Sequence, residues 1–261
     1  MILASETKQG TLRDMSSHKI AVCGRKGGVG KTTTAACLAS YYASHDIRVL
    51  VVDLDPQSNT GYVLGVDPVA PGSAELICGD SPTPLKAAEN LFVLPGGASL
   101  QENAVQQSDS VELEYAIKKF SGYGVIIFDC PPGNDHLERL GLIAADTALI
   151  CTNAHPLGIV GAERVLSEVK RRQDTQRKGP KHCALILTQI NKSRSLDKNI
   201  PGQLAKKHPD TALFSISQRS DFHWATAAGI PFMDNSPSAK AISDIEEIAI
   251  WVANKADKRK K

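Results

Sequence analysis

The sequence contains no apolar run near the roughly 18 residues that a membrane-spanning helix needs, and its mean hydropathy is slightly negative. Its first residues, MILASETKQGTLRDMSS, lack the basic-then-apolar order of a secretory signal. The six cysteines stand singly with no Cys-x-x-Cys pair, so neither a zinc knuckle nor a disulfide framework is indicated. These absences favour a protein of the reducing cytoplasm.

Aromatic residues are scarce, at 5%, and there is no repeat, low-complexity block or clear linker. The 261 residues are 42% hydrophobic and 22% charged, which is ordinary for one large globular domain and excludes a largely disordered chain. The formal net charge is only +2, but residues 164–207 hold twelve Lys and Arg against three acids. This uneven charge indicates a polyanionic partner, and a solvated helix face explains it equally well.

Short apolar runs alternate with helical patterns from Lys19 onward. Several runs are apolar at consecutive positions, which is typical of strands covered on both faces. The predicted strands cover residues 19–24, 48–55, 91–96, 123–133, 146–154, 182–191 and 212–218. The predicted helices cover residues 31–45, 111–120, 135–145, 158–173, 195–208, 220–229 and 237–256. The alternation predicts an α/β fold with a mostly parallel central sheet and helices on both faces.

We therefore expect one domain over residues 18–254. A polar, aperiodic leader occupies residues 1–17, and residues 255–261, KADKRKK, form a basic tail.

A glycine-rich turn between the first strand and the first helix is the strongest local signal. It reads RKGGVGKTT over residues 25–33. Gly27, Gly28 and Gly30 allow successive backbone N–H groups to curl around phosphate oxygens in front of a helix N-terminus. The order of strand, glycine loop, Lys-Thr and helix therefore predicts a nucleotide phosphate site.

In a loop of this kind Lys31 reaches the terminal phosphates, and the Thr32 hydroxyl ligates Mg²⁺. The usual first glycine of the pattern is replaced by Arg25, and a second lysine, Lys26, stands directly before the glycines. The predicted phosphate-binding residues are Gly27, Gly28, Val29, Gly30, Lys31, Thr32 and Thr33.

The stretch KGGVGKTT, from Lys26 to Thr33, resembles the signature of the ParA/Soj/MinD family of deviant Walker A ATPases. This resemblance implies a single-domain P-loop NTPase that binds ATP with Mg²⁺ and hydrolyses it. It also implies an ATP-bound homodimer, in which Lys26 reaches the phosphates of the nucleotide held by the partner subunit. A lysine supplied across the interface makes nucleotide binding and dimerisation one event, much as an arginine finger does.

Two acidic strand ends fit the same family. VVDLDPQSNT resembles its first switch segment, and the resemblance implies that Asp55 activates the attacking water while Asp53 organises Mg²⁺ and the loop. Asp53 and Asp55 share a face because alternate strand residues do; two solvated acids are the alternative explanation. VIIFDCPPG ends on Asp129, a Walker B acid near the metal, and DCPPG resembles the second switch segment. The implied catalytic residues are Lys26, Lys31 and Asp55, and the implied metal residues are Thr32, Asp53 and Asp129.

Later motifs are weaker. The family often places Asn or Asp after the strand that reads ALILTQIN here, which points to Asn191 as the adenine contact. The following ALFSISQRSDFHWATAAGIPFMD resembles the family's adenine loop, but Ser217 or Gln218 stands where Pro is common.

Partition ATPases of this family bind DNA non-specifically through basic residues in their C-terminal third. No aromatic residue is interleaved in residues 164–207, so we expect phosphate contacts rather than base stacking, and a steep dependence on salt. The candidate DNA contacts are Lys170, Arg171, Arg172, Lys192, Arg194, Lys198, Lys206, Lys207 and Arg219.

The resemblance thus implies a small, cytoplasmic, nucleoid-associated ParA-type ATPase. A ParB-like centromere-binding protein or other cargo adaptor would stimulate its hydrolysis, and repeated release and rebinding would move a plasmid, chromosome or other cargo.

Two alternatives stay open. A MinD-like ATPase would bind membranes through a C-terminal amphipathic helix, but Ile245, Ile248, Ala249 and Val252 favour a last helix docked on the core, so a membrane is not the expected partner. A reductase like the nitrogenase iron protein shares the loop and needs a cysteine pair per subunit; Cys130 lacks an evident partner and is predicted to be a packed residue.

Overall fold

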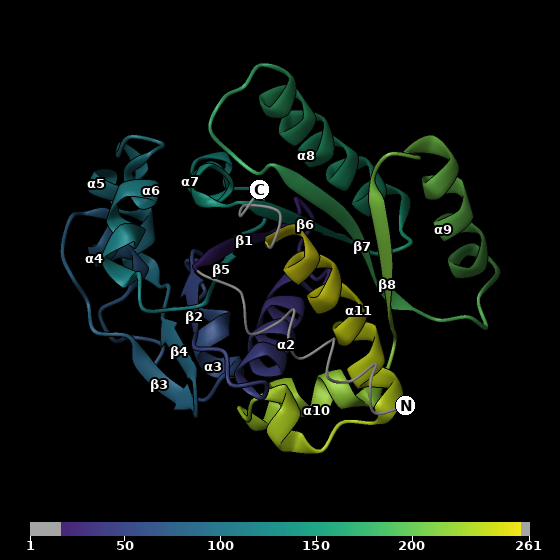
Figure 1. The fold of residues 1–261 in the computed structure, drawn as a ribbon, viewed down its shortest axis with the longest axis horizontal. Helices are drawn as coiled ribbons and strands as arrows, with labels where there is room; N and C mark the ends of the chain where they lie inside the picture. The colour runs from purple at the N-terminus through teal and green to yellow at the C-terminus, as the bar shows by residue number, and fades with distance from the viewer. Residues whose placement is uncertain (1–16, 257–261) are drawn as a thin grey trace.

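An eight-stranded sheet in the order β3-β4-β2-β5-β1-β6-β7-β8 forms the centre of the molecule (Figure 1). The structure is a computed structural model that describes residues 17–256. The strands are β1 (His18–Cys23), β2 (Val49–Asp53), β3 (Leu85–Ala88), β4 (Leu91–Leu94), β5 (Val125–Asp129), β6 (Thr147–Thr152), β7 (His182–Ile190) and β8 (Ala212–Ser217). All pairings are parallel except that of β3 with β4. The predicted α/β class with a mostly parallel sheet is confirmed.

Helices cover both faces of this sheet. The α-helices are α2 (Lys31–Ala43), α3 (Asn59–Val63), α4 (Ser73–Ile77), α5 (Asn103–Gln106), α6 (Glu112–Ala116), α7 (Asp135–Ala144), α8 (Pro156–Asp174), α9 (Ser195–Lys207), α10 (Ser220–Ala228) and α11 (Ala239–Ala256). Three 3₁₀ turns are η1 (Ala98–Gln101), η2 (Ile117–Phe120) and η3 (Phe232–Asn235). One core cluster joins one sheet face to α2, α10 and α11, and a second joins the other face to α4, α6, α7 and α8.

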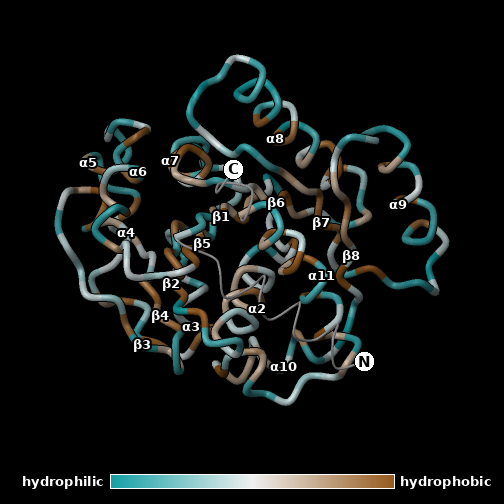
Figure 2. The backbone as a smooth tube through the Cα atoms, in the orientation of Figure 1, coloured by the Kyte–Doolittle hydropathy of each residue, from teal (hydrophilic) through white to brown (hydrophobic). Residues whose placement is uncertain are grey.

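Strand chemistry explains this layering. Ile20, Ala21, Val22 and Cys23 of β1 are all fully buried, and successive residues belong alternately to the two core clusters. Figure 2 shows the hydrophobic strands in the middle and polar turns on the outer sides of α8 and α9. Burial on both faces is the reason that these strands carry uninterrupted apolar runs.

The last helix packs on the core, as expected. Ile245, Ile248, Ala249 and Val252 are fully buried, and α11 packs against α2 and β8. Lys255 lies within α11, so the helix includes the first two residues of the predicted basic tail; the remainder of the tail and the predicted leader before Ser17 lie outside the described residues. Within residues 17–256, no helix has both the length and the apolar character to cross a membrane.

Some elements differ from the prediction. β3 was not predicted, because the four residues LKAA carry little strand pattern and are ordered by antiparallel pairing with β4. The helix predicted over residues 111–120 is α6 followed by η2, since the chain tightens into a 3₁₀ turn at Ile117. The strand predicted over residues 123–133 ends at Asp129, and the proline-containing segment beyond it forms a loop.

Candidate nucleotide site

The parallel topology brings the predicted site together. The loops that follow β1, β2 and β5 all leave the carboxyl edge of the sheet, where ligands bind in open α/β folds. A cleft of about 800 Å³ opens there. Its lining includes Gly27, Gly28, Gly30, Lys31, Thr32, Thr33, Asp55, Pro131, Pro132 and Gly133.

The backbone conformation of the loop favours glycine at two positions. Gly28 and Gly30 have φ angles of 71° and 75°, in the left-handed region that favours glycine, and Gly30 is the N-cap of α2. A side chain added at Gly27 or Gly28 would meet no atom within 4 Å, because both face open space. The loop therefore presents bare backbone and the N-terminus of α2 to the cleft, which suits phosphate oxygens.

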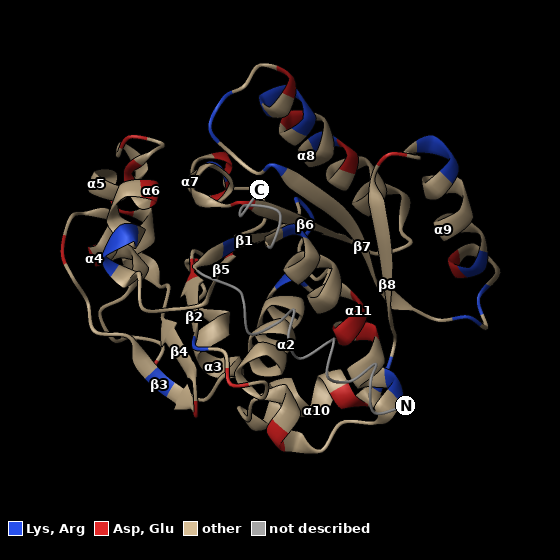
Figure 3. Ribbon diagram, in the orientation of Figure 1, with Lys and Arg blue, Asp and Glu red and all other residues tan. Residues whose placement is uncertain are grey.

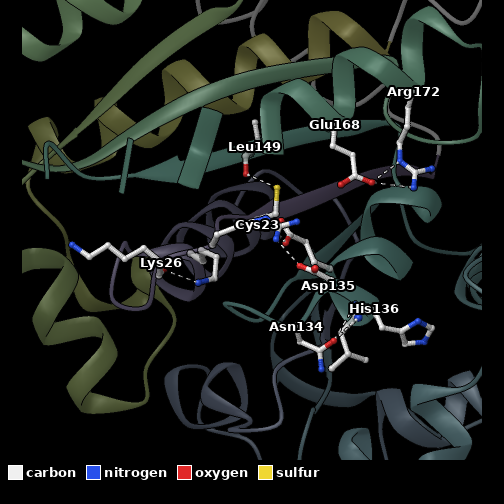
Figure 4. A network of polar contacts seen from close by, with 12 residues as sticks. Cys23, Lys26, Asn134, Asp135, His136, Leu149, Glu168 and Arg172 are labelled. Atoms are coloured by element: carbon white, nitrogen blue, oxygen red, sulfur yellow. Dashed lines mark hydrogen bonds and ion pairs between the residues drawn. The ribbon is translucent and has the colours of Figure 1, made fainter. Parts of the chain in front are cut away.

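Lys31 is buried at the first turn of α2. Its Nζ lies 3.4 Å from the backbone oxygen of Lys26, so the side chain folds back across the loop. By contrast, the ammonium of Lys26 makes no ion pair within residues 17–256, and in Figure 4 its side chain extends away from Asp135. The two lysines thus point to different places, one over the loop and one outward.

The end of β7 holds the phosphate loop from the other side, a contribution that the sequence motifs did not indicate. The Thr188 hydroxyl donates to the Val29 oxygen at 2.8 Å, and Gln189 Nε2 donates to the Gly28 oxygen at 3.0 Å. Gln189 has a φ of 58°, an uncommon backbone conformation for this residue type. Motif spacing could not have revealed these contacts, because they join residues about 160 positions apart.

Asp53 and Asp129 stand opposite one another on the paired strands β2 and β5, and both are buried. The Asp53 carboxylate accepts the backbone N–H groups of Asp55 and Thr60, at 2.9 and 3.0 Å. The Thr60 hydroxyl donates to Asp129 Oδ2 at 2.8 Å. Thr60, which the motifs also did not indicate, therefore ties the first switch segment to the strand end that carries Asp129.

Burial and mutual repulsion perturb this pair. Burial, and then the neighbouring Asp129 carboxylate, raise the pKa of Asp53 well above its ordinary value. Burial raises the pKa of Asp129 to about 6, although hydrogen bonds from Thr32 and Thr60 lower it. Two buried carboxylates side by side form a repulsive arrangement that a nearby divalent cation relieves.

The residues present fit a Mg²⁺ ion that is bound mainly by phosphates and water. Asp129 Oδ1 is buried and has no hydrogen-bond partner among the described residues. No group of three or more His, Cys, Asp or Glu side chains within residues 17–256 could cage a metal. Mg²⁺ keeps several waters and takes few protein ligands, so the Thr32 hydroxyl, with Asp129 behind it, is a sufficient protein contribution.

Asp55 differs from the other two acids because it lines the cleft. One of its carboxylate oxygens accepts the Gln57 backbone N–H at 2.9 Å, which orients the side chain within the turn. A fixed carboxylate at the cleft wall is suited to hold the proton of a water molecule.

The second switch segment closes another side of the cleft. Pro131 and Pro132 line it, Gly133 has a φ of 70°, and Asn134 caps α7 by accepting the N–H groups of His136 and Leu137 (Figure 4). The segment that lines the cleft thus continues directly into a capped helix. Cys130, before the prolines, is fully buried in the core against α7, and burial raises the pKa of its thiol well above the ordinary value.

Asn191 lines neither the cleft nor the smaller pocket beside it. Its Oδ1 accepts the Ser193 N–H and hydroxyl, and its Nδ2 lies 3.4 Å from Gln218 Oε1. Gln218 does line the smaller pocket, which has a volume of about 120 Å³ and shares Gly30, Thr33 and Gln189 with the cleft. Asn191 therefore approaches this pocket through Gln218.

The predicted DNA contacts do not form one patch. Lys192, Arg194, Lys198 and Arg219 lie at or near the carboxyl edge of the sheet, whereas Lys170, Arg171, Arg172, Lys206 and Lys207 lie at the far ends of α8 and α9 (Figure 3). Some are already paired: Arg172 with Glu168, Lys207 with Glu163 and Arg219 with Asp221.

Fold and cleft together define a P-loop ATPase. The family model AAA_31, described as an AAA domain, matches residues 17–180, and the chain belongs to that family. Within it, the chain is an ATPase of the ParA/Soj/MinD type that uses ATP and Mg²⁺, which confirms the family, activity and cofactors predicted from the sequence.

Individual relatives agree with this assignment. The chain is 27% identical over 237 residues to the chromosome-partitioning ATPase Soj of Treponema pallidum, covering 86% of this chain and 92% of the relative. MinD of Pyrococcus horikoshii, solved with Mg-ADP, superposes with a TM-score of 0.74 at 26% identity, covering 89% of this chain and 94% of the other. A variant of McdA from Cyanothece, solved in complex with ATP, is 23% identical with a TM-score of 0.78 and shares the fold over 92% of this chain and 96% of its own.

Proposed function

We propose that this ATPase partitions or positions a cargo by forming a homodimer around ATP, binding DNA non-specifically as that dimer, and releasing it on hydrolysis. The observation that carries the proposal is the position of Lys26, which precedes the phosphate loop with an ammonium that makes no ion pair in the described part of the chain. A cation beside the cleft with no partner in its own subunit is suited to neutralise a nucleotide held by a second one.

The exposed apolar residues support a dimer at this edge. Tyr62, Leu157, Leu196 and Trp224 are 63%, 70%, 49% and 68% exposed. Each belongs to a helix that follows the carboxyl end of a strand, on the same side as the cleft. An isologous dimer would cover these side chains and both clefts at once.

The roles within one subunit follow from the contacts. The loop amides and Lys31 bind the phosphates, and Asp55 accepts the proton of the attacking water at the cleft wall. Bound Mg²⁺ supplies charge neutralisation at the phosphate oxygens. The hydrogen bond from Thr60 to Asp129 keeps the first switch segment beside the strand that ends at the cleft.

As the DNA-binding residues we favour Lys192, Arg194 and Lys198, which we call the edge group. All three are exposed and make no ion pair among the described residues, unlike Arg172 and Lys207. Because they lie near the proposed dimer face, two copies would come together when ATP is bound, which would make DNA binding depend on the nucleotide. Such binding would hold the protein on the nucleoid.

A ParB-like centromere-binding protein or another cargo adaptor is the proposed activator. The similarity to the Treponema relative, a chromosome-partitioning ATPase, supports this choice of activator. The structural similarity to MinD and McdA supports a wider role in positioning.

The test combines molar mass with DNA retention. Asp55→Ala protein, in which ATP should persist, is expected to double in mass with Mg-ATP but not with Mg-ADP, and to bind DNA only with ATP. Adding Lys26→Ala should keep it monomeric, whereas substituting the exposed Lys86 of β3, Lys86→Ala, should not. A chain that stays monomeric with ATP, or binds DNA equally without nucleotide, contradicts the proposal.

A further inference from the structure

Arg25 connects the phosphate loop to the helix that follows the second switch segment. Its Nη1 contacts the Asp135 carboxylate, and its Nε lies 3.7 Å from Glu138 Oε2. Both acids stand in the first turn of α7, three residues apart and therefore on one side of the helix. The residue that replaces the first glycine of the usual loop pattern is thus the one that reaches α7.

Glu138 is the more deeply buried of the two acids. Its side chain is 3% exposed, and neither of its oxygens has a hydrogen-bond partner among the described residues. Burial raises the pKa of Glu138 to about 7, and Arg25 is the main group that lowers it. Because burial disfavours the charged form of Glu138 and Arg25 favours it, removing Arg25 would shift Glu138 toward its protonated form and leave the side chain without its charged partner under α7.

Arg25 also packs against α8. A side-chain carbon added at Gly161 of α8 would lie 3.3 Å from Arg25 Cβ, so α8 packs closely against the residue. Arg25 Nε is itself buried. The backbone at this point is consequently held between α7 and α8.

The next residue is Lys26, whose backbone oxygen is the one that Lys31 Nζ approaches. The same peptide segment therefore carries the Lys26 side chain and contacts the ammonium of Lys31. The position of Arg25 therefore determines the position of this peptide segment.

We propose that Arg25 is a positioning residue, which locks the phosphate loop to Asp135 and Glu138 so that movement of the second switch segment is transmitted through α7 to Lys26 and Lys31. The link to α7 stands on these contacts alone; its effect on Lys26 rests on the proposed function.

A double-mutant cycle tests this link through basal ATP turnover. Arg25→Gln is expected to lower kcat about tenfold and to change the Kd of Mg-ADP by less than about threefold. ADP binding needs the loop amides and Lys31 but not Lys26, whose proposed target is the nucleotide of the partner subunit. Glu138→Gln should lower kcat about fivefold, and the double variant should be no worse than Arg25→Gln within about twofold, since both remove one contact.

The control is Lys178→Gln, which breaks the 2.6 Å ion pair with Glu114 away from the cleft and should leave kcat unchanged. Thermal unfolding and circular dichroism establish that each variant is folded. If Arg25→Gln does not fold, Arg25→Lys takes its place in the cycle, because lysine keeps the charge but cannot contact both acids at once. Multiplicative losses in the double variant, or a kcat of Arg25→Gln within about twofold of the wild type, overturn the proposal.

Hydrogen exchange separates this proposal from the proposed function. Mg-ADP should slow amide exchange across residues 135–144 in the wild-type chain and in Lys178→Gln, and should do so much less in Arg25→Gln. This readout needs no dimer, DNA or activator. Equal protection of α7 in Arg25→Gln refutes the link, whereas a monomeric ATP complex refutes only the function proposed for Lys26.

Discussion

At the residue scale, exposure separates the three aspartates at the ends of β2 and β5. Asp53 and Asp129 are 0% and 1% exposed, and Asp55 is 8% exposed and lines the cleft. Both carboxylate oxygens of Asp53 accept hydrogen bonds from backbone N–H groups, which is a structural role. Asp55 retains access to the cleft, so it is the carboxylate that can meet water.

Asp55→Ala is therefore expected to lower the ATP turnover number by about 100-fold or more while leaving nucleotide affinity within about twofold. Lys31→Ala should show the opposite pattern, with loss of nucleotide binding itself. Titration calorimetry with Mg-ADP and steady-state turnover measure the two effects. An unchanged rate of hydrolysis in Asp55→Ala would show that another group activates the attacking water.

Glu138 makes stability depend on pH. Its pKa is about 7 in the folded protein against a usual 4.5, so the unfolded chain releases the proton first as pH rises. The stability that its protonated form contributes is present below about pH 4.5 and is lost as pH rises through about 7.

Across that window the free energy of unfolding of the wild type should fall by up to about 3 kcal/mol relative to Glu138→Gln. Urea unfolding of both proteins from about pH 5 to about pH 8 measures this difference in the free energy of unfolding. The other buried acids are present in both proteins, so their titrations cancel in the difference. A difference that does not vary with pH would show that Glu138 ionises as freely in the folded state as in the unfolded one.

At the scale of elements, the end of β7 acts as a support for the phosphate loop. The Thr188 hydroxyl shares its one hydrogen between the Val29 oxygen at 2.8 Å and the Thr152 oxygen at 3.1 Å, so it joins β6, β7 and the loop before α2. The loop conformation therefore depends on a strand that lies far beyond it in the sequence.

Thr188→Val keeps the shape of the side chain and removes both contacts. It should lower the free energy of unfolding by about 1–3 kcal/mol, because buried carbonyls lose their donor, and weaken Mg-ADP binding about fivefold. Thr175→Val, at the exposed end of α8, removes a hydroxyl that bonds the Arg171 oxygen and is the matched control. Equal effects of the two substitutions would contradict a support role for β7.

At the scale of the whole molecule, the sheet has two functional edges. The carboxyl edge carries the cleft, the exposed residues Tyr62, Leu157, Leu196 and Trp224, and the edge group. The far ends of α8 and α9 carry the other basic residues (Figure 3). One basic stretch of sequence is thus divided, because α8 and α9 run from one edge of the sheet to the other.

Reversing the charge of the edge group, Lys192, Arg194 and Lys198, should abolish ATP-dependent DNA binding and leave Mg-ADP affinity unchanged. In single variants of the group, the slope of log affinity against log salt should fall by about one unit for each phosphate that is no longer bound. Reversal of Arg171 and Lys206 at the opposite edge is the matched comparison and should have a smaller effect. If the opposite-edge variant fails to bind DNA and the edge-group variant still binds it, the surface is assigned wrongly.

How much could be predicted varied with the range of the interaction. Strand and helix order, the glycine loop and the acidic strand ends follow local rules, so residues 25–33 and 53–55 already indicated an ATP site. Thr60, Thr188 and Gln189 were missed, because each is defined by a partner on another element. Asn191 remains a prediction for adenine, since its observed partners are Ser193 and Gln218.

The sequence by itself determined the class of the protein, because apolar runs of strand length, glycines before a Lys-Thr pair and acids at strand ends act through neighbouring residues. The tertiary structure decided how these parts are held together. In the sequence, Arg25 shows only as a departure from the usual loop pattern. The packing of α7 and α8 around the loop places it against the buried carboxyl of Glu138. Burial and pairing across the fold are set by contacts that sequence spacing does not encode.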